Sequence, residues 1–266
     1  MQKELQLRND LPHNRFKRAI AAGEPQIGLW LSLVSPASTE VAAGAGFDWL
    51  IIDMEHSAND LPEVLAHLRA AEGGTAEPVV RIPWNDPIVV KRLLDAGART
   101  LLFPFVQSAE EAARAVAATR YPPRGIRGVA GVTRANRYGR VPSYFARAET
   151  EICVLVQLET RKAAAAVDEI AAVDGIDGLF VGPADLSADF GHPNDWNRPD
   201  IWDAILTAGA RAVKAGKAAG FLSGREEDCR KVLAGGFTFV AVGSDLGIVA
   251  RGTDALVKTY GDVKKK

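Results

Sequence analysis

Residues 152–187 read ICVLVQLETRKAAAAVDEIAAVDGIDGLFVGPADLS. The stretch begins with a short apolar run, continues through an alanine-rich segment with helical spacing, and ends in a second apolar run at 178–181. A short β-rich run followed by a longer amphipathic stretch is one βα unit, and such units build parallel sheets. The stretch therefore predicts a strand, a helix and a neighbouring strand.

The same alternation extends outward to both ends of the chain, without a linker rich in Pro, Gly or Ser. Eight such units favour a single domain over residues 1–266, a (β/α)8 TIM barrel, an α/β fold that commonly runs to about 250 residues. The first run lacks a following G-x-G-x-x-G, which disfavours an open dinucleotide-binding sheet. A helix at 14–22 is expected to close the barrel floor. The predicted strands are 26–33, 48–53, 78–82, 100–106, 152–159, 178–181, 219–223 and 237–242.

Composition excludes several other classes of protein. The chain is 47% hydrophobic and 24% charged, with a formal net charge of -1, so it is neither disordered nor marked for nucleic acid. It has no apolar run of about 18 residues and no signal-peptide pattern, which predicts a cytoplasmic protein with no membrane partner. Cys153 and Cys229 do not form a CxxC pair, which argues against a disulfide scaffold or structural zinc.

Polar side chains gather where four of the predicted strands end. In a barrel of this kind the carboxyl ends of the strands form one mouth, where active sites are built. We therefore expect four groups to point into that mouth. They are Asp53-Met54-Glu55-His56, Arg81, Gln157-Leu158-Glu159 and Gly182-Pro183-Ala184-Asp185.

Glu159 continues a row of inward-facing side chains. Alternation along its strand places it with Cys153, Leu155 and Gln157. A buried carboxylate without a partner is costly, and Asp185 on the next strand adds a second negative charge. A shared proton, a basic side chain or a divalent cation would relieve the repulsion. Two protein oxygens suit Mg²⁺ or Mn²⁺, although a structural ion pair is an equal alternative for Glu159 alone.

The other residues at the mouth narrow the chemistry. No lysine lies within a predicted strand, which disfavours a Schiff base. A metal would instead polarise a carbonyl and stabilise an enolate, with Arg81 adding positive charge at the same oxygen. The simpler role for Arg81 is an ion pair with a neighbouring carboxylate. His56 is the histidine at a strand end and the candidate general base, whereas His67 is expected on a surface helix and His192 in a loop.

Two features lie outside this pattern. Asp95 occupies the last turn of a predicted helix, where a negative charge opposes the helix dipole; a partner elsewhere or simple solvation would account for it. Residues 121–147 contain six arginines among prolines and glycines. We expect a surface connection with a short helix there, or alternatively an arm that reaches a neighbouring subunit.

Seven segments occur in an order that is known from one enzyme family. They are GLW (28–30), DMEH (53–56), VRIPWND (80–86), LLDAGA (93–98), YPPRGIRGV (121–129), QLET (157–160) and GPADLS (182–187). Together they resemble the class II pyruvate aldolases, the group of 2,4-dihydroxyhept-2-ene-1,7-dioate aldolase and 2-dehydro-3-deoxyglucarate aldolase. The resemblance extends from about residue 14 to about residue 254.

The resemblance implies roles for individual residues. Each role is carried over only to a position that matches a family motif. Glu159 and Asp185 match the metal ligands, and His56 matches the general base. Arg81 matches the residue that stabilises the enolate-like transition state, Asp95 the acid that raises the basicity of the histidine, and Asp53 a carboxylate beside that histidine. The pyruvate site is matched by Gln157 and by the backbone of Gly182, Pro183, Ala184 and Asp185, and the substrate pocket by Trp30.

The resemblance also implies the reaction and its partners. Such enzymes use Mg²⁺, Mn²⁺ or Co²⁺ and join or cleave pyruvate or hydroxypyruvate and an aldehyde. They assemble as homohexamers that exchange C-terminal helices, and Asp95 would fit a contribution across a subunit boundary. Two alternatives stay open: a lyase of the citrate lyase β-subunit type acting on a coenzyme A thioester, and a non-catalytic barrel that senses a 2-keto acid.

Overall fold

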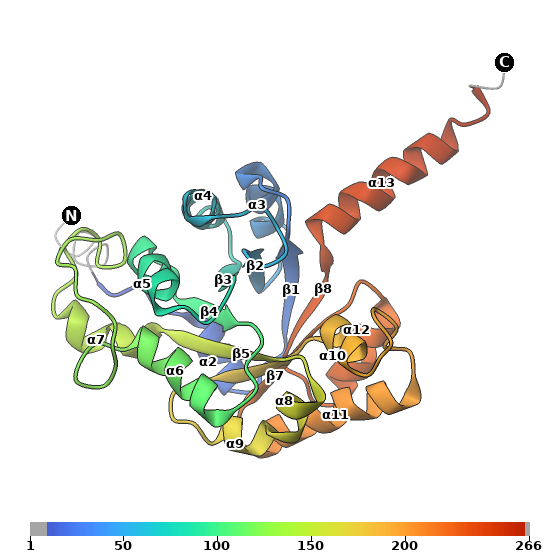
Figure 1. Ribbon diagram of the computed structural model, residues 1–266. Helices are drawn as coiled ribbons and strands as arrows, with labels where there is room; N and C mark the ends of the chain where they lie inside the picture. Colours follow the sequence, from blue (N-terminus) through green and yellow to red (C-terminus); the bar gives the residue numbers. More distant parts are fainter. Residues whose placement is uncertain (1–9, 264–266) are drawn as a thin grey trace.

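The computed structural model describes residues 10–263, which form a closed barrel of eight parallel strands surrounded by helices (Figure 1). The strands pair in sequence order, and β8 closes the barrel on β1. The prediction of a (β/α)8 barrel is thus confirmed. The strands are β1 (Gln26–Leu31), β2 (Trp49–Asp53), β3 (Glu77–Arg81), β4 (Thr100–Phe103), β5 (Cys153–Leu158), β6 (Gly178–Val181), β7 (Ala218–Leu222) and β8 (Phe239–Ser244).

Several helices begin or end where the sequence provides a cap. Ser35, Asp60 and Asp86 each accept a backbone N–H in the first turn of the helix that follows. Gly97 adopts the left-handed conformation that ends α5, as its position after Asp95-Ala96 predicts. The helices are α2 (Arg15–Ala21), α3 (Pro36–Ala43), α4 (Leu61–Ala71), α5 (Pro87–Ala96), α6 (Ala109–Thr119), α7 (Tyr144–Glu151), α8 (Arg161–Ala165), α9 (Val167–Ala171), α10 (Pro183–Asp189), α11 (Pro199–Lys214), α12 (Glu226–Ala234) and α13 (Asp245–Thr259).

Several details differ from the expectations. The strand predicted at 26–33 ends at Leu31, and the strand predicted at 237–242 runs from Phe239 to Ser244. The strand predicted at 100–106 ends at Phe103, because the backbone turns at Phe105, whose φ is 55°. His67 belongs to α4 as expected but is buried rather than on the surface: its ring lies 2.5 Å from the hydroxyl of Thr39 on α3 and 2.9 Å from the amide oxygen of Asn59. The packing of α3 against α4 removes this side chain from solvent.

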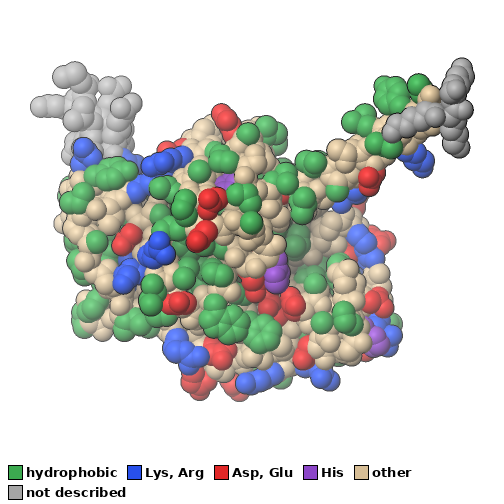
Figure 2. All heavy atoms as spheres, turned by 45° about the horizontal axis from the view of Figure 1, so that its top comes forward, with side chains coloured by type: hydrophobic (Ala, Val, Ile, Leu, Met, Phe, Trp, Pro, Cys, Tyr) green, Lys and Arg blue, Asp and Glu red, His purple; other side chains and the backbone are tan. Residues whose placement is uncertain are grey.

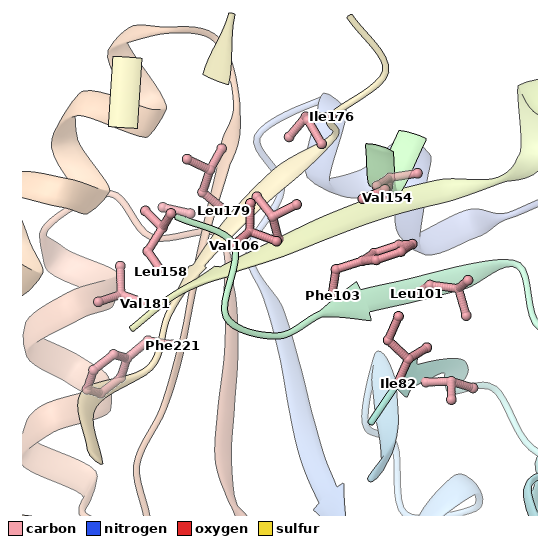
Figure 3. Packing of buried hydrophobic residues seen from close by; sticks show 14 of the residues in the cluster. Ile82, Leu101, Phe103, Val106, Val154, Leu158, Ile176, Leu179, Val181 and Phe221 are labelled. Atoms are coloured by element: carbon pink, nitrogen blue, oxygen red, sulfur yellow. The ribbon is translucent and has the colours of Figure 1, made fainter. Parts of the chain in front are cut away.

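Side chains on β5 alternate between two hydrophobic layers, as predicted. Cys153 and Leu155 lie in the cluster inside the barrel. Val154 and Leu158 belong to the larger cluster between the strands and the surrounding helices, where Figure 3 shows Leu158 near Val181. The inward row therefore continues to Gln157 and Glu159 at the mouth.

Helix α2 closes the opposite end of the barrel, again as predicted. Phe16 inserts between Trp49 and Phe239, with ring centroids 5.6 and 5.7 Å away. The cap of this helix is Asn14, which is buried and donates to the hydroxyl of Thr100 at 2.8 Å. The aromatic floor, defined as Phe16, Trp49 and Phe239, leaves the mouth at the other end.

Helix α13 projects from the barrel beyond the ends of β1 and β8 (Figure 1). Hydrophobic side chains lie along its length (Figure 2), and Leu256, Val257 and Tyr260 are each more than 60% exposed. Asp245 at its first position is its one buried residue. Within residues 10–263 no helix combines the length and apolar character needed to cross a membrane.

Candidate active site

A cavity of about 340 Å³ opens at the carboxyl ends of the strands. Most of the predicted site residues meet there, although they come from β1, β2, β3, β5 and the start of α10. Trp30, His56, Arg81, Gln157, Gly182, Pro183, Ala184 and Asp185 line the cavity.

Asp53 and Arg81 form a paired centre beside the cavity. Arg81 Nε donates to Asp53 Oδ1 at 2.8 Å, and its Nη2 donates to Oδ2 at 2.6 Å. The indole N–H of Trp30 donates to the same carboxylate at 3.1 Å, and the Arg81 guanidinium lies 4.8 Å from the Trp30 ring. Burial alone would raise the pKa of Asp53, but Arg81 and these hydrogen bonds outweigh it and lower the pKa. Asp53 is therefore ionised and holds Arg81 in place.

Glu55 is a member of this centre that the sequence reasoning did not assign a role. Its Oε2 lies 2.8 Å from Arg81 Nη1, so Arg81 is bound by two carboxylates. The simpler expectation for Arg81, an ion pair, is thus seen directly. Burial raises the pKa of Glu55, and the nearby Asp53 and Asp185 act in the same direction against Arg81 and His56. The sequence signal that could have identified Glu55 is its position two residues beyond Asp53, the last residue of β2.

Glu159 is a buried acid whose pKa is affected by two neighbouring acids, Glu55 and Asp185. Its side chain is buried, and Oε1 has no hydrogen-bond partner among the described residues. Burial raises its pKa to about 8, and the charges of Glu55 and Asp185 contribute to the rise. Asp185 lies in α10, directly after β6, and β6 pairs with β5, so the two acids follow neighbouring strands.

Gly182 provides space beside Glu159. A Cβ atom at this position would lie 2.9 Å from Glu159 Cγ and 2.9 Å from Gln157 Nε2. Helix α10 begins directly after Gly182, and no side chain caps its first turn. The Oε1 atom of Gln157 is also buried without a partner in the described part of the chain. The side chains of Gln157 and Glu159, each with one unpaired buried oxygen, thus both approach the space beside Gly182.

His56 lines the cavity and is exposed, consistent with a group that exchanges protons with a ligand. Its backbone N–H donates to Asp53 Oδ1 at 3.3 Å, which fixes the turn after β2. Within residues 10–263 its ring makes no hydrogen bond. Asp53 therefore positions the backbone of His56 rather than its imidazole.

Asp95 does not join these residues within one chain. It lies on α5, outside the set that lines the cavity, and pairs with Arg127 Nη2 at 2.9 Å. Arg127 belongs to the arginine-rich stretch 121–147, which contains the expected connection and the start of short helix α7, but its side chain is fully buried against Tyr121. The partner of Asp95 in this chain is thus an arginine.

The donor set fits a divalent cation with open coordination positions. Among residues 10–263 no three His, Cys, Asp or Glu side chains are grouped to hold a metal. Glu159 and Asp185 instead offer carboxylate oxygens. Buried polar atoms normally have a partner, and a cation would provide one for the unpaired Glu159 Oε1. Two carboxylates with water and ligand oxygens suit Mg²⁺ or Mn²⁺.

Comparisons with known proteins identify the family of the chain. The family model described as HpcH/HpaI aldolase/citrate lyase matches residues 26–252. The 5-keto-4-deoxy-D-glucarate aldolase of Enterobacter sp. (strain 638) is 50% identical over 252 residues, covering 95% of this chain and 98% of that protein. The 4-hydroxy-2-oxo-heptane-1,7-dioate aldolase of Klebsiella pneumoniae is 52% identical over 249 residues, covering 93% and 94%. A solved HpcH/HpaI family structure from Burkholderia cenocepacia J2315 has a TM-score of 0.90 and 42% identity, covering 92% and 98%.

Proposed function

Because this chain belongs to the HpcH/HpaI aldolase/citrate lyase family, we propose that its mouth cavity catalyses reversible aldol cleavage of a 2-keto acid. Aldolases are lyases, so the prediction of a carbon–carbon lyase is confirmed. The donor would be pyruvate or hydroxypyruvate, and the acceptor an aldehyde. The observation that carries the proposal is the buried, unpaired oxygen of Glu159 beside Asp185 at the mouth.

The names of the relatives narrow the substrate class. Both named substrates are dicarboxylic acids with a keto group near one end and a second carboxylate at the other. Aldol cleavage of either yields pyruvate and an aldehyde that retains the second carboxylate. We therefore extend the proposal to acceptors of this kind.

Glu159 and Asp185 would hold the divalent cation, Mg²⁺, Mn²⁺ or Co²⁺. When bound, such an ion supplies Lewis-acid polarisation of the keto oxygen. Gln157 and the uncapped N–H groups that follow Gly182 would bind the carboxylate of the keto acid, since the first turn of a helix favours anions.

The proton chemistry would fall to His56. In condensation its exposed imidazole would take a proton from the carbon next to the keto group and give a proton to the aldehyde oxygen, which becomes the hydroxyl of the aldol. In cleavage it would take the proton back from that hydroxyl. Arg81, held by Asp53 and Glu55, would supply positive charge where the keto oxygen becomes negative. Because Arg81 is fixed before the substrate arrives, no reorganisation is needed during the reaction.

The same family resemblance suggests a homohexamer with exchanged C-terminal helices. Two observations support it: the apolar side chains of the projecting α13 are exposed in one chain, and Asp95 is not among the described residues that line the cavity. In the proposed assembly Asp95 would act on the histidine of a neighbouring subunit. Native mass spectrometry tests the assembly: a monomer at micromolar concentration contradicts it.

Exchange of the methyl protons of pyruvate tests the reaction most directly. In D₂O with Mn²⁺ the protein should incorporate deuterium into pyruvate, and a chelator should stop the incorporation. Aldehydes added with pyruvate should give aldol products. Binding of pyruvate without exchange would instead indicate a sensor, and cleavage of an added acyl-coenzyme A would favour the citrate lyase alternative.

A further inference from the structure

Two arginines line the mouth cavity, and they differ in whether they are paired with an acid. All three nitrogen groups of Arg81 are engaged by Asp53 and Glu55, and the residue is buried. Arg251 lines the same cavity from the second turn of α13 and is exposed. It forms no ion pair with any carboxylate in residues 10–263. Among the described residues of the cavity wall, Arg251 is thus the arginine that remains available to a ligand.

Two acids next to elements of the cavity wall, Asp245 and Asp228, are committed to other partners. Asp245 accepts the backbone N–H of Ser32 at 2.8 Å and the hydroxyl of Ser38 at 2.9 Å, which fixes the start of α13 on the end of β1. Asp228 accepts from Ser223 at 2.8 Å and is paired with Arg225 at 2.5 Å. Their charges are therefore used to fasten the cavity wall.

Gly247 contributes to the placement of Arg251. A Cβ atom at Gly247 would lie 3.1 Å from Arg251 Nη1, closer than a side chain normally approaches. The absence of a side chain thus lets the guanidinium lie against the first turn of α13. Because Ser244 caps that turn and Asp245 anchors it, Arg251 projects from a fixed element rather than from a loose tail.

The cavity consequently has two electrostatic sides. Asp185 lines the side of the cavity that follows β6, and Glu159 lies buried behind that side, where the proposed cation and the keto acid would bind. Arg251 follows β8, two strands further round the barrel. A ligand that spans the cavity would therefore meet a guanidinium at the end away from the keto group. A guanidinium is matched in charge and shape to a carboxylate.

We propose that Arg251 binds the carboxylate of the aldehyde acceptor and makes the enzyme selective for aldehydes that carry one. This assignment rests on the proposed aldol reaction, and it adds to that reaction a residue that determines specificity. Arg251 contacts the part of the substrate that does not react, so its loss should raise the KM for charged acceptors more than it lowers kcat.

The test compares two aldehydes of equal length, one ending in a carboxylate and one in a methyl group, in Mn²⁺-dependent condensation with pyruvate. The wild-type protein should show a higher kcat/KM for the charged aldehyde. In Arg251→Gln this preference should fall about 10- to 100-fold, as expected for a lost charge-assisted hydrogen bond. Arg251→Lys should retain part of the preference, because it keeps the charge without the planar fork.

Lys258→Gln is the matched control, since Lys258 is an exposed cation on the same helix and lies outside the cavity wall. Its preference should equal that of the wild type. An unchanged preference in Arg251→Gln, or an equal change in Lys258→Gln, overturns the assignment of Arg251. Failure of the wild-type protein to exchange the methyl protons of pyruvate overturns the proposed function instead. If Arg251→Gln does not fold, the value for Arg251→Lys decides, with the wild-type preference contradicting the proposal.

Discussion

The two ends of the barrel treat buried acids in opposite ways. At the floor, Glu151 accepts hydrogen bonds from the backbone of Asn14 at 2.7 Å and from Arg18 at 2.6 Å. Glu77 is likewise paired with Arg15 at 2.7 Å and Arg99 at 3.0 Å. At the mouth, Glu159 is as deeply buried but retains an oxygen without a partner in the described chain.

The pKa values follow the same division. Burial acts to raise the pKa of Glu151, but the hydrogen bonds from Arg18 and Asn14 outweigh it and lower the pKa. Burial raises the pKa of Glu159, where neighbouring acids add to the effect. An acid with internal partners stabilises the fold, whereas an acid kept among like charges is unfavourable until a ligand arrives. This contrast is the physical basis for placing function at the mouth.

The largest expected effect is at Glu159. Glu159→Gln should lower kcat by about a thousandfold or more, because the proposed cation loses a charged ligand, and losing one electrostatic contact typically costs about 10²–10³ in rate. Its free energy of unfolding should stay equal or increase, since a costly buried acid is removed. Steady-state kinetics and urea unfolding measure both quantities. Full activity in this variant would contradict the role of Glu159.

The converse variant at the floor is Glu151→Gln. It should reduce the free energy of unfolding by about 2–3 kcal/mol, because Arg18 and the Asn14 N–H lose a charged acceptor. Its kcat should remain within about twofold of the wild type, since helix α2 and the mouth lie at opposite ends. Urea unfolding with parallel kinetics checks this pair of outcomes. A large loss of activity without a loss of stability would remove the contrast between the two ends.

Substitution of two glycines in the cavity wall tests whether the space beside Glu159 is needed for metal binding. Gly182→Ala should weaken metal binding about tenfold, because the new methyl group would press on Glu159 and Gln157. Gly224→Ala is the matched control: a Cβ there would meet nothing within 4 Å. Isothermal titration with Mn²⁺ measures both affinities. Equal affinities in the two variants would show that the space beside Gly182 is not needed for the cation.

The raised pKa of Glu159 predicts a smaller, pH-dependent effect. At pH 7 a carboxyl with a pKa of about 8 is mostly protonated, so binding of Mn²⁺ should release up to about one proton. The release should vanish above about pH 9, where the acid is already ionised. Calorimetry in buffers of different ionisation enthalpy measures this number.

The raised pKa of Glu159 also predicts how the stability of the metal-free protein changes with pH. Because the pKa of Glu159 is higher in the folded than in the unfolded chain, the folded state binds more protons between about pH 4.5 and pH 8. Its contribution to stability is present below this range and is lost as the pH rises through it. Glu159→Gln should remove this part of the pH dependence, and an identical pH profile in both proteins would contradict the assignment.

Much of the fold could be predicted from the sequence because its signals are local. The alternation along β5 placed Cys153 and Leu155 inside the barrel and carried Glu159 to the mouth. The end of β4 was wrong because Phe105 adopts a left-handed conformation that its residue type does not announce. The burial of His67 was missed because it depends on α3 packing over α4, a tertiary contact.

The candidate site was predictable where it lies at strand ends and not elsewhere. Asp53, Arg81 and Gln157 follow the rule that barrel strands present polar side chains at their carboxyl ends. Arg251 lies within a helix, and only the anchoring of the first turn of α13 brings it to the cavity. The partner of Asp95 was equally hidden, since Arg127 lies 32 positions further along the chain.

The aromatic floor closes the barrel at the end opposite the mouth. At the mouth, Glu159 has 2% of its surface exposed, whereas Arg251 is exposed. Above the floor the barrel interior is filled by packed side chains, so ligands can reach this region only from the carboxyl ends of the strands. In the proposed reaction both reactants would therefore enter, and both products leave, on the same side of the barrel.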